Sequence, residues 1–570
     1  MSYLHRRDFL ALLSGQRSRS IASEAPLEPA LSPALENLFA QRSANPPTSG
    51  LAPYTGPWTR AEVIHLLRRT LFGPTKADVD YFLSKGMNQA VYEILRAPYS
   101  PPAGPVNDYN NPNFTDPQVP FGQSFVNAPL NPLAEPYRIE SVRGWWLRLL
   151  LNSGRSIREK MTLFWHNHIP VEFSIVPLGS ALYRYNQTLR DHALGNFRSL
   201  IRAITLDPAM LFYLNGYLNS RQAPDENYAR EIQELFVIGK DLPQHYTEDD
   251  VKAAARLLTG WRTDGFTTTF SPFHHDVGDK QFSAFYNNRL IKGRSGPNAG
   301  AIELDEFLDM LLAHPEAARF ICRKIYRFFV YHDISPEVEQ NVIEPLAQIF
   351  RSSNYDILPV LETLFRSEHF FDPLNRGAII KSPADMTVGL FRCFGVQIPA
   401  TADLFDRLVL SYQINLAMAA MMQHLGDPPN VSGWQAYYQR PLFDKIWITT
   451  ATLPKRAEAT DAMVFTGIFG INNRIAIDPL TWAATLTNPS NVNALINESL
   501  ELLLGLPVSQ EVKNSFKAIL LSNLPDESYW TYGWMLWQNN PNDPTLSGAL
   551  RIRLQAYLQR VLQMEEFHLC

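Results

Sequence analysis

The sequence has few cysteines, no long hydrophobic run and no cluster of basic residues. Its three cysteines, Cys322, Cys393 and Cys570, are too few and too scattered for a disulfide framework or a structural zinc site. No stretch reaches the roughly 18 uninterrupted apolar residues that a transmembrane helix needs, so an integral membrane segment is not expected. The formal net charge is −5, and binding of nucleic acid through phosphate neutralisation is therefore not expected either.

Motifs of common enzyme classes are also missing. The chain contains no Gly-x-Ser-x-Gly elbow, no glycine-rich phosphate loop and no His-Glu-x-x-His pair, so the usual nucleotide-binding and hydrolase templates are unsupported. By contrast, 45% of the 570 residues are hydrophobic and 12% are aromatic, which is ample for a large buried core.

Helix-start signals recur along the chain and predict a predominantly α-helical fold. The stretches 59–62 and 75–78 have the form of capping boxes, in which the side chains at both ends satisfy backbone donors. Ser382 is followed by Pro383 and Asp385, which places a cap, a proline and an acid at the start of a further helix. We therefore expect a large helical domain with long irregular loops.

Composition divides the chain into three parts. Residues 1–57 are rich in Ser, Pro, Ala and Arg and are expected to be a flexible segment and linker. Residues 58–460 are expected to form a helical core domain, interrupted by a proline-rich insertion at 99–136. Residues 461–570 are expected to be a C-terminal helical extension packed on that core. Aromatic residues and threonines within 262–300 indicate loops that include a short β-hairpin.

The N-terminus contains an arginine pair, Arg6 and Arg7, followed by Asp-Phe-Leu. This order resembles the core of a twin-arginine export signal, which needs an apolar stretch after the arginines. Here residues 14–17, Ser-Gly-Gln-Arg, interrupt that stretch. We therefore favour a short basic helix, a remnant of such a signal, and a cytoplasmic location over export to the periplasm.

Two histidines lie at the end of a predicted helix. Ser156 and Glu159 have the capping-box form, so a helix is expected from Ile157 toward His168. At about 100° per residue, His168 lies on the apolar face and His166 lies about 160° away from it. Residues on opposite sides of one helix cannot bind the same ion. We therefore interpret His168 as a core histidine and His166 as a polar-face residue, with ligation of a metal by either one as the alternative.

The segment 225–239 predicts an amphipathic helix with a polar stripe beside its buried face. Asn227, Glu231 and Glu234 lie within about 60° of one another on that stripe. Carboxylates that border an apolar face are costly unless they are paired or hydrogen-bonded. An ion pair between Arg230 and Glu234 would be structural, whereas Glu231 and Asn227 facing a polar cavity would be metal ligands or acid-base groups.

Two later loops carry further candidate residues. His275 and Asp276 are adjacent in the first loop, and imidazole and carboxylate groups together suit zinc, iron or manganese. Asn430 and Trp434 lie in the second loop, between prolines and a glycine. That loop is either a binding loop or a rigid structural loop with Trp434 as its anchor.

Seven motifs, taken in order, resemble the bacterial family named domain of unknown function 1800. They are HLLRRTLFGPTKADVD, REKMTLFWHNHIPV, NYAREIQELFVIGKDLPQHYTEDDVKAAARLLTGW, FHHDVGDK, FICRKIYRFFV, KSPADMTVGLFRCFG and GDPPNVSGWQAYYQRPLFDKIWITTATLPKR. The resemblance implies a predominantly helical protein to which no activity is assigned. The polar positions that recur in the family correspond here to Trp165, His166, His168, Asn227, Arg230, Glu231, Glu234, His275 and Asp276.

The resemblance also implies a partner. Members are often encoded beside a second family, domain of unknown function 1501, which resembles sulfatase and alkaline-phosphatase folds and usually carries a twin-arginine signal. A protein of that second family is therefore the expected partner, in the cell envelope. This sequence departs from the family pattern in its interrupted N-terminal signal and in its insertion at 99–136.

Two classes of function follow from these observations. In the favoured class, the chain is a non-catalytic scaffold that binds an envelope partner, and its polar residues form a buried hydrogen-bond network. In the alternative class, it is a metal-dependent hydrolase or oxidoreductase whose three polar segments converge on a divalent transition metal. That alternative assigns catalysis to Glu231, His275 and Asp276, metal ligation to His166 and His168, and binding to Trp165, Asn227, Arg230, Glu234, Asn430 and Trp434.

Overall fold

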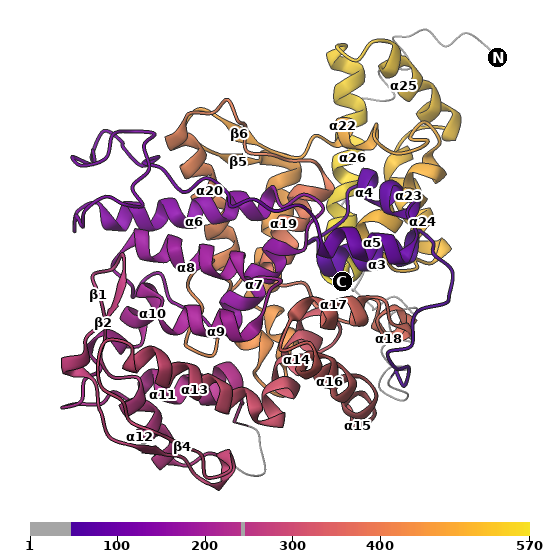
Figure 1. The fold of residues 1–570 in the computed structure, drawn as a ribbon. Helices are drawn as coiled ribbons and strands as arrows, with labels where there is room; N and C mark the ends of the chain where they lie inside the picture. The colour runs from indigo at the N-terminus through magenta and orange to yellow at the C-terminus, as the bar shows by residue number, and fades with distance from the viewer. Residues whose placement is uncertain (1–46, 241–244) are drawn as a thin grey trace.

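The computed structural model describes residues 47–240 and 245–570, and within them the fold is predominantly α-helical (Figure 1). The predicted fold class is therefore confirmed. The arginine pair at positions 6 and 7 and most of the segment 1–57 lie outside the described residues. The division of the chain at residues 57 and 460 stays a prediction.

The helices of the first half are mostly short. They are α3 (Arg60–Thr70), α4 (Lys76–Leu83), α5 (Met87–Leu95), α6 (Glu135–Leu151), α7 (Arg158–His168), α8 (Gly179–Asp191), α9 (Phe197–Thr205), α10 (Pro208–Tyr213), η1 (Gly216–Leu218), α11 (Asn227–Glu231), the π-helical turn η2 (Ile232–Val237) and α12 (Glu248–Leu257).

Longer helices dominate the second half. They are η3 (Pro272–His274), η4 (Ala284–Tyr286), α13 (Ala299–Ala313), α14 (Pro315–Phe329), α15 (Pro336–Val338), η5 (Glu339–Ile343), α16 (Glu344–Ser352), α17 (Ile357–Phe365), α18 (Glu368–Phe371), η6 (Pro373–Asn375), α19 (Pro383–Cys393), α20 (Leu404–Ala420), η7 (Gln435–Tyr437), η8 (Phe443–Trp447), α21 (Thr452–Asp461), η9 (Ala462–Thr466), α22 (Pro479–Ala483), α23 (Val492–Leu504), α24 (Gln510–Leu521), α25 (Glu527–Asn539), α26 (Pro544–Leu562) and η10 (Glu565–His568).

Three predicted helix starts are confirmed. Both reciprocal hydrogen bonds of a capping box are present at Thr59 and at Thr75, so α3 and α4 begin where the sequence indicates. The Ser382 side chain accepts a hydrogen bond from the Asp385 amide at the start of α19. Each of these signals is local, because the capping residue and its partner are three positions apart.

The capping box predicted at Ser156 is wrong. Helix α7 begins at Arg158, whose amide donates to Ser156 Oγ at 3.2 Å, but the Glu159 carboxylate does not complete a capping box and accepts two hydrogen bonds from the buried Arg190 of α8, at 2.6 and 3.0 Å. A charge-assisted pair with a guanidinium is stronger than a neutral cap, so tertiary packing overrides the local pattern.

One hydrophobic core joins the two ends of the described chain. Its largest cluster of buried apolar side chains includes Val63 of α3 and Phe567 of η10. Helix α3 lies beside α23 in Figure 1, and the Arg68 guanidinium donates hydrogen bonds to the carbonyl oxygens of Leu503 and Leu569. Burial of apolar surface stabilises the fold by about 25 cal/mol per Å². Because α3 and η10 share this core, α3 and the C-terminal segment complete the packing of one another.

Helix α7, which carries His166 and His168, lies inside the helical body. Helix α6 packs against α8 and α20, and α7 packs against α8 (Figure 1). Trp146 of α6 and Trp165 of α7 are both fully buried, so the end of α7 is surrounded by packed side chains.

The proline-rich insertion is irregular, as predicted, and is fixed to the helical body. Between α5 and α6 the described chain has no helix or strand element. The buried Arg138 guanidinium of α6 donates to Asp116 at 2.9 Å and to Glu135 at 2.8 Å, and Tyr109 also donates to Asp116 at 2.8 Å. The Arg138–Asp116 ion pair thus adds to the burial of Tyr109 and Phe125 in the main core, and both hold the insertion on the helical body.

The strands are short and antiparallel. They pair as β1 (Trp261–Thr263) with β2 (Thr268–Phe270), β3 (Lys280–Gln281) with β4 (Leu290–Ile291), and β5 (Ile468–Phe469) with β6 (Arg474–Ile475). The register of the first pair places Trp261 opposite Phe270, with ring centroids 5.0 Å apart. The short hairpin expected within 262–300 is therefore confirmed. None of the described helices combines the length and the apolar character that crossing a bilayer requires.

Replacing Arg138 with methionine should lower the free energy of unfolding by about 3–5 kcal/mol, because Asp116 and Glu135 would remain buried without their cation. Urea-induced unfolding followed by circular dichroism measures the change. Arg198→Met is the matched control, because Arg198 pairs with the exposed Asp309 and should cost less than about 1 kcal/mol. Equal effects of the two substitutions would show that the buried pair does not anchor the insertion.

Candidate functional site

His166 lies at the end of α7 among aromatic side chains. Its ring centroid is 4.9 Å from that of Trp146 and 5.6 Å from that of Trp434, and its Nδ1 lies 3.2 Å from the Tyr185 hydroxyl. The side chain is fully buried, and burial lowers the pKa of His166 to about 3, so the imidazole is neutral at physiological pH. The prediction that His166 lies on the polar face of the helix is therefore wrong, because its side chain is buried.

His168 connects α7 to the helix formed by α11 and η2, which we call the acidic helix. Its Nε2 lies 2.8 Å from the carbonyl oxygen of Phe236, so Nε2 carries the proton and donates it. Burial, with a smaller contribution from the nearby Lys324 ammonium, lowers the pKa of His168 to about 3. A neutral histidine bonded to a backbone carbonyl is the core histidine that the sequence indicated.

Two tryptophans fix segments around α7. Trp165 Nε1 donates a hydrogen bond to the carbonyl oxygen of Ala193 at 3.0 Å, and the Trp434 amide donates to Asn167 Oδ1 at 2.9 Å. Gly433 has a φ of +86°, and a Cβ there would lie 2.2 Å from the Asn167 carbonyl oxygen. Only glycine fits so close to the helix. Trp434 and Gly433 therefore clamp their loop onto the end of α7.

The two candidate asparagines make local contacts. The Asn430 side chain accepts a hydrogen bond from the Ser432 amide at 2.8 Å and donates to the Tyr438 hydroxyl at 3.0 Å. The Asn227 side chain is exposed at the start of α11, and its backbone amide donates to Asp225 at 2.9 Å. Asn430 shapes its own loop, and Asn227 faces solvent.

The acidic helix contains a π-helical turn, and this changes its ion pairs. Helix α11 continues into η2, where an extra residue in the turn rotates later positions away from the α-helical pattern. Arg230 pairs with Glu248 at 2.7 Å and with Glu226 at 3.3 Å, while Glu234 accepts from the Tyr246 hydroxyl at 2.8 Å. The pair expected between Arg230 and Glu234 is therefore wrong.

Glu231, a predicted catalytic residue, has a raised pKa. Partial burial, together with the neighbouring Glu234 carboxylate, raises the pKa of Glu231 to about 7. Among the residues that the structure describes, no hydrogen bond or ion pair reaches the Glu231 carboxylate. The group is therefore partly protonated at neutral pH.

His275 belongs to a separate buried network. Its Nδ1 lies 2.9 Å from the carbonyl oxygen of Thr259, and its Nε2 lies 3.2 Å from Glu303 Oε1 on α13. Lys280 Nζ donates to Glu303 Oε2 at 2.6 Å, and the Arg294 amide donates to Glu303 Oε1 at 2.7 Å. The side chains of Glu303 and Lys280 are completely buried. Every polar atom of this carboxylate is therefore bonded to protein.

Asp276 lies at the edge of the same network. It receives two hydrogen bonds from the Arg256 guanidinium, both at 2.9 Å, and one from the Gly278 amide at 2.8 Å. A bidentate guanidinium pair satisfies both carboxylate oxygens.

The predicted residues do not assemble into the single metal centre that the enzyme hypothesis requires. His168 touches the acidic helix through Phe236, whereas His275 and Asp276 bond to Glu303, Thr259 and Arg256 instead. Across residues 47–240 and 245–570, no three His, Cys, Asp or Glu side chains are placed to hold a metal ion. Within the described chain His168 and His275 thus bond to different partners, and the roles predicted for these residues stay predictions.

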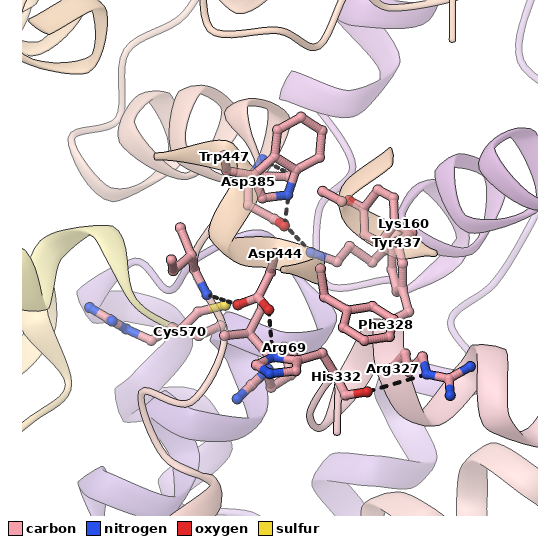
Figure 2. Close-up of a pocket in the computed structure, with 16 residues that line it drawn as sticks. Arg69, Lys160, Arg327, Phe328, His332, Asp385, Tyr437, Asp444, Trp447 and Cys570 are labelled. Atoms are coloured by element: carbon pink, nitrogen blue, oxygen red, sulfur yellow. Dashed lines mark hydrogen bonds and ion pairs between the residues drawn. The ribbon is translucent and has the colours of Figure 1, made fainter. Parts of the chain in front are cut away.

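Figure 2 shows a charged internal cavity that the sequence interpretation missed. Its wall combines residues from α3, α7, α14, α19, η7 and η8 with Cys570. Lys160 makes an ion pair with Asp385, and His332 Nδ1 lies 2.6 Å from Asp444. The available signal was the presence of charged residues, such as Arg68 and Arg69, inside otherwise apolar helical motifs.

An open groove lies between α3 and α23. It has a volume of about 890 Å³, within the range of ligand-binding clefts. Apolar side chains such as Ile64, Leu500 and Val508 line it together with charged ones of both signs, such as Lys513 and Glu501.

A comparison of the sequence with models of known protein families agrees with the family resemblance of the seven motifs. A family model described as protein of unknown function (DUF1800) matches residues 65–567, which confirms the resemblance. No curated protein and no solved structure matches the chain.

Replacing Lys280 with methionine should lower the free energy of unfolding by about 3–5 kcal/mol, because the Glu303 carboxylate would stay buried without its cation. The double variant Lys280→Met/Glu303→Leu should recover most of that loss, since both charges are then removed. Urea midpoints of the two variants test the expectation. A double variant no more stable than the single one would contradict a purely structural role for this pair.

Glu231→Gln should change how stability depends on pH. The folded-state pKa of about 7 lies above the ordinary glutamate value of 4.5, so the folded protein binds more protons between these two pH values and its stability falls as pH rises through them. Glutamine does not titrate, so the Glu231→Gln variant does not lose this stability as pH rises. The difference between its melting temperature and that of the wild type should therefore shift in favour of the variant from pH 5 to pH 8.

The control for this titration is Glu248→Gln. Pairing with Arg230 lowers the pKa of Glu248, so its contribution is present at neutral pH and is lost as pH falls. This variant should therefore keep a constant stability relative to wild type from pH 5 to pH 8, because Glu248 titrates below that range in both the folded and the unfolded state. A Glu231→Gln profile parallel to wild type would exclude an elevated pKa.

Proposed function

The chain belongs to the DUF1800 family of proteins of unknown function, and we propose that it is a non-catalytic helical scaffold that binds a partner protein. The observation that carries the proposal is the closed network of Lys280, Glu303 and His275, in which both carboxylate oxygens and both ring nitrogens face protein partners. Catalytic groups need an atom that is free to meet substrate.

The histidines of α7 support the same proposal. His168 is committed to a backbone carbonyl, and His166 is enclosed by aromatic rings. Their low pKa values make both neutral, and full burial separates them from any dissolved substrate. We therefore assign both histidines to the packing of α7 and assign partner binding to residues on the protein surface.

The groove between α3 and α23 is the surface that best fits a partner. Its apolar floor can accept side chains of an extended or helical segment, and its charged rim offers both Arg60 and Glu498. A partner segment with apolar anchors flanked by charges of both signs complements it. The proposed partner is a protein of the domain of unknown function 1501 family, as the family resemblance implies.

Filling the groove should weaken this binding. Asn497 is exposed and lines the groove, so Asn497→Trp should raise the dissociation constant for a protein of the domain of unknown function 1501 family about tenfold or more. Isothermal titration calorimetry with the two purified proteins measures it. Asn514→Trp is the matched control, because Asn514 is exposed on α24 outside the groove and should bind as wild type does.

Two results would contradict the proposal. Identical affinities for wild type and Asn497→Trp would exclude the groove as the docking surface. Stoichiometric zinc, iron or manganese in the purified protein, lost on combined replacement of Glu231 and His275 by alanine, would restore the metal-enzyme alternative.

A further inference from the structure

Buried cations line and adjoin the cavity of Figure 2. Arg68 and Arg69 line it and expose 6 and 2% of their surface. Lys381, between the lining residues Ile380 and Ser382, and Arg456, which donates to the Lys381 carbonyl oxygen, lie beside it and expose 7 and 0%. Within the described chain their hydrogen bonds go mainly to backbone carbonyl oxygens. Examples are Asn375, which accepts from Arg69 at 2.8 Å, and Phe567, which accepts from Lys381 at 2.5 Å.

The acids of the cavity wall already have partners. Asp385 pairs with Lys160 and accepts a hydrogen bond from Ser382 at 2.9 Å. Asp444 lies against His332 at 2.6 Å and accepts from the Ile380 amide at 2.7 Å. The wall of the cavity holds the four cationic side chains of Arg68, Arg69, Lys160 and Arg327 and the two carboxylates of Asp385 and Asp444, so positive charge is in excess there.

Burying this excess positive charge is energetically unfavourable, and the lowered pKa values of the basic side chains reflect the cost. Burial, together with the neighbouring Arg68, lowers the pKa of Lys381 to about 7. Burial lowers the pKa of Arg456 to about 10 and that of His568 to about 3, and for His568 the nearby Arg456 and Lys381 add to the effect. Uncompensated buried charge costs several kcal/mol per ion, so a counter-charge at this position would be strongly favoured.

Arg69 supplies free donors at the cavity. Its guanidinium donates through Nη2 to the Asn375 carbonyl, whereas its buried Nε and Nη1 have no hydrogen-bond partner in the described chain. Arg68 Nε is unpartnered in the same way. Unsatisfied buried donors of a guanidinium suit an anion, because arginine offers five N–H groups and no acceptor.

The size of the cavity restricts which anion fits. Its volume is about 20 Å³, and a cavity of about 10–15 Å³ admits one water molecule. Phosphate, sulfate and organic carboxylates are too large. A single water molecule fits but leaves the charge unbalanced, whereas a monatomic anion both fits and balances it.

We propose that this cavity binds one monatomic anion, chloride under ordinary conditions, through the unpartnered guanidinium nitrogens of Arg69. The bound anion neutralises the cation cluster where α3, α19 and the C-terminal segment meet. The site is separate from the groove between α3 and α23, and it does not depend on the proposed partner.

Thermal unfolding of the full chain tests the proposal. Melting temperatures are compared in sodium chloride and sodium gluconate at equal ionic strength, since gluconate is too large to enter. Chloride should raise the melting temperature by on the order of a few degrees, with saturation, because it binds the folded state. Arg69→Met should abolish the difference, and Arg198→Met, a change at an exposed ion pair, should retain it.

Crystals of the wild-type protein grown with sodium bromide give the second measurement. An anomalous bromide peak within contact distance of Arg69 would support the proposal even if Arg69→Met does not fold. A cavity that holds only water in that map, equal melting temperatures in the two salts, or a chloride effect that survives in a folded Arg69→Met variant would each overturn it.

Discussion

Buried charge is the constraint on which the rest of this structure depends. Lys280 of β3 pairs with Glu303 of α13, and Lys160 of α7 pairs with Asp385 of α19. Such pairs add little net stability, because desolvation offsets most of their attraction, yet an unpaired member is strongly destabilising. The helices must therefore pack so that all of these pairs form together. This requirement selects one arrangement among the many that would bury a similar amount of apolar surface.

The sequence predicts the parts of the fold that have local causes. The caps of α3, α4 and α19 depend on residues three positions apart, and each forms as expected. The π-helical turn at Ile232–Val237 follows no local signal that we recognised. Assuming regular 3.6-residue periodicity across it led directly to the wrong Arg230–Glu234 pair, because one additional residue per turn rotates every later side chain.

The candidate site was harder to predict, and for a different reason. Lys160 and Asp385 are 225 positions apart, and no pattern within either segment names the other as its partner. Three of the polar residues in the motifs, His168, His275 and Asp276, make specific buried or partly buried contacts. Which of them share a site depends on long-range packing, which periodicity and spacing do not encode.

The hydrogen bond from α3 to the C-terminal segment has a consequence for biosynthesis. Arg68 donates to the carbonyl oxygen of Leu569, which lies 501 positions later in the chain. At about 5–20 residues per second, a ribosome needs roughly 25–100 s to add that interval. During this time α3 lacks its final neighbours and leaves apolar surface uncovered. A newly made chain therefore depends on a molecular chaperone, or on provisional contacts, until translation is nearly finished.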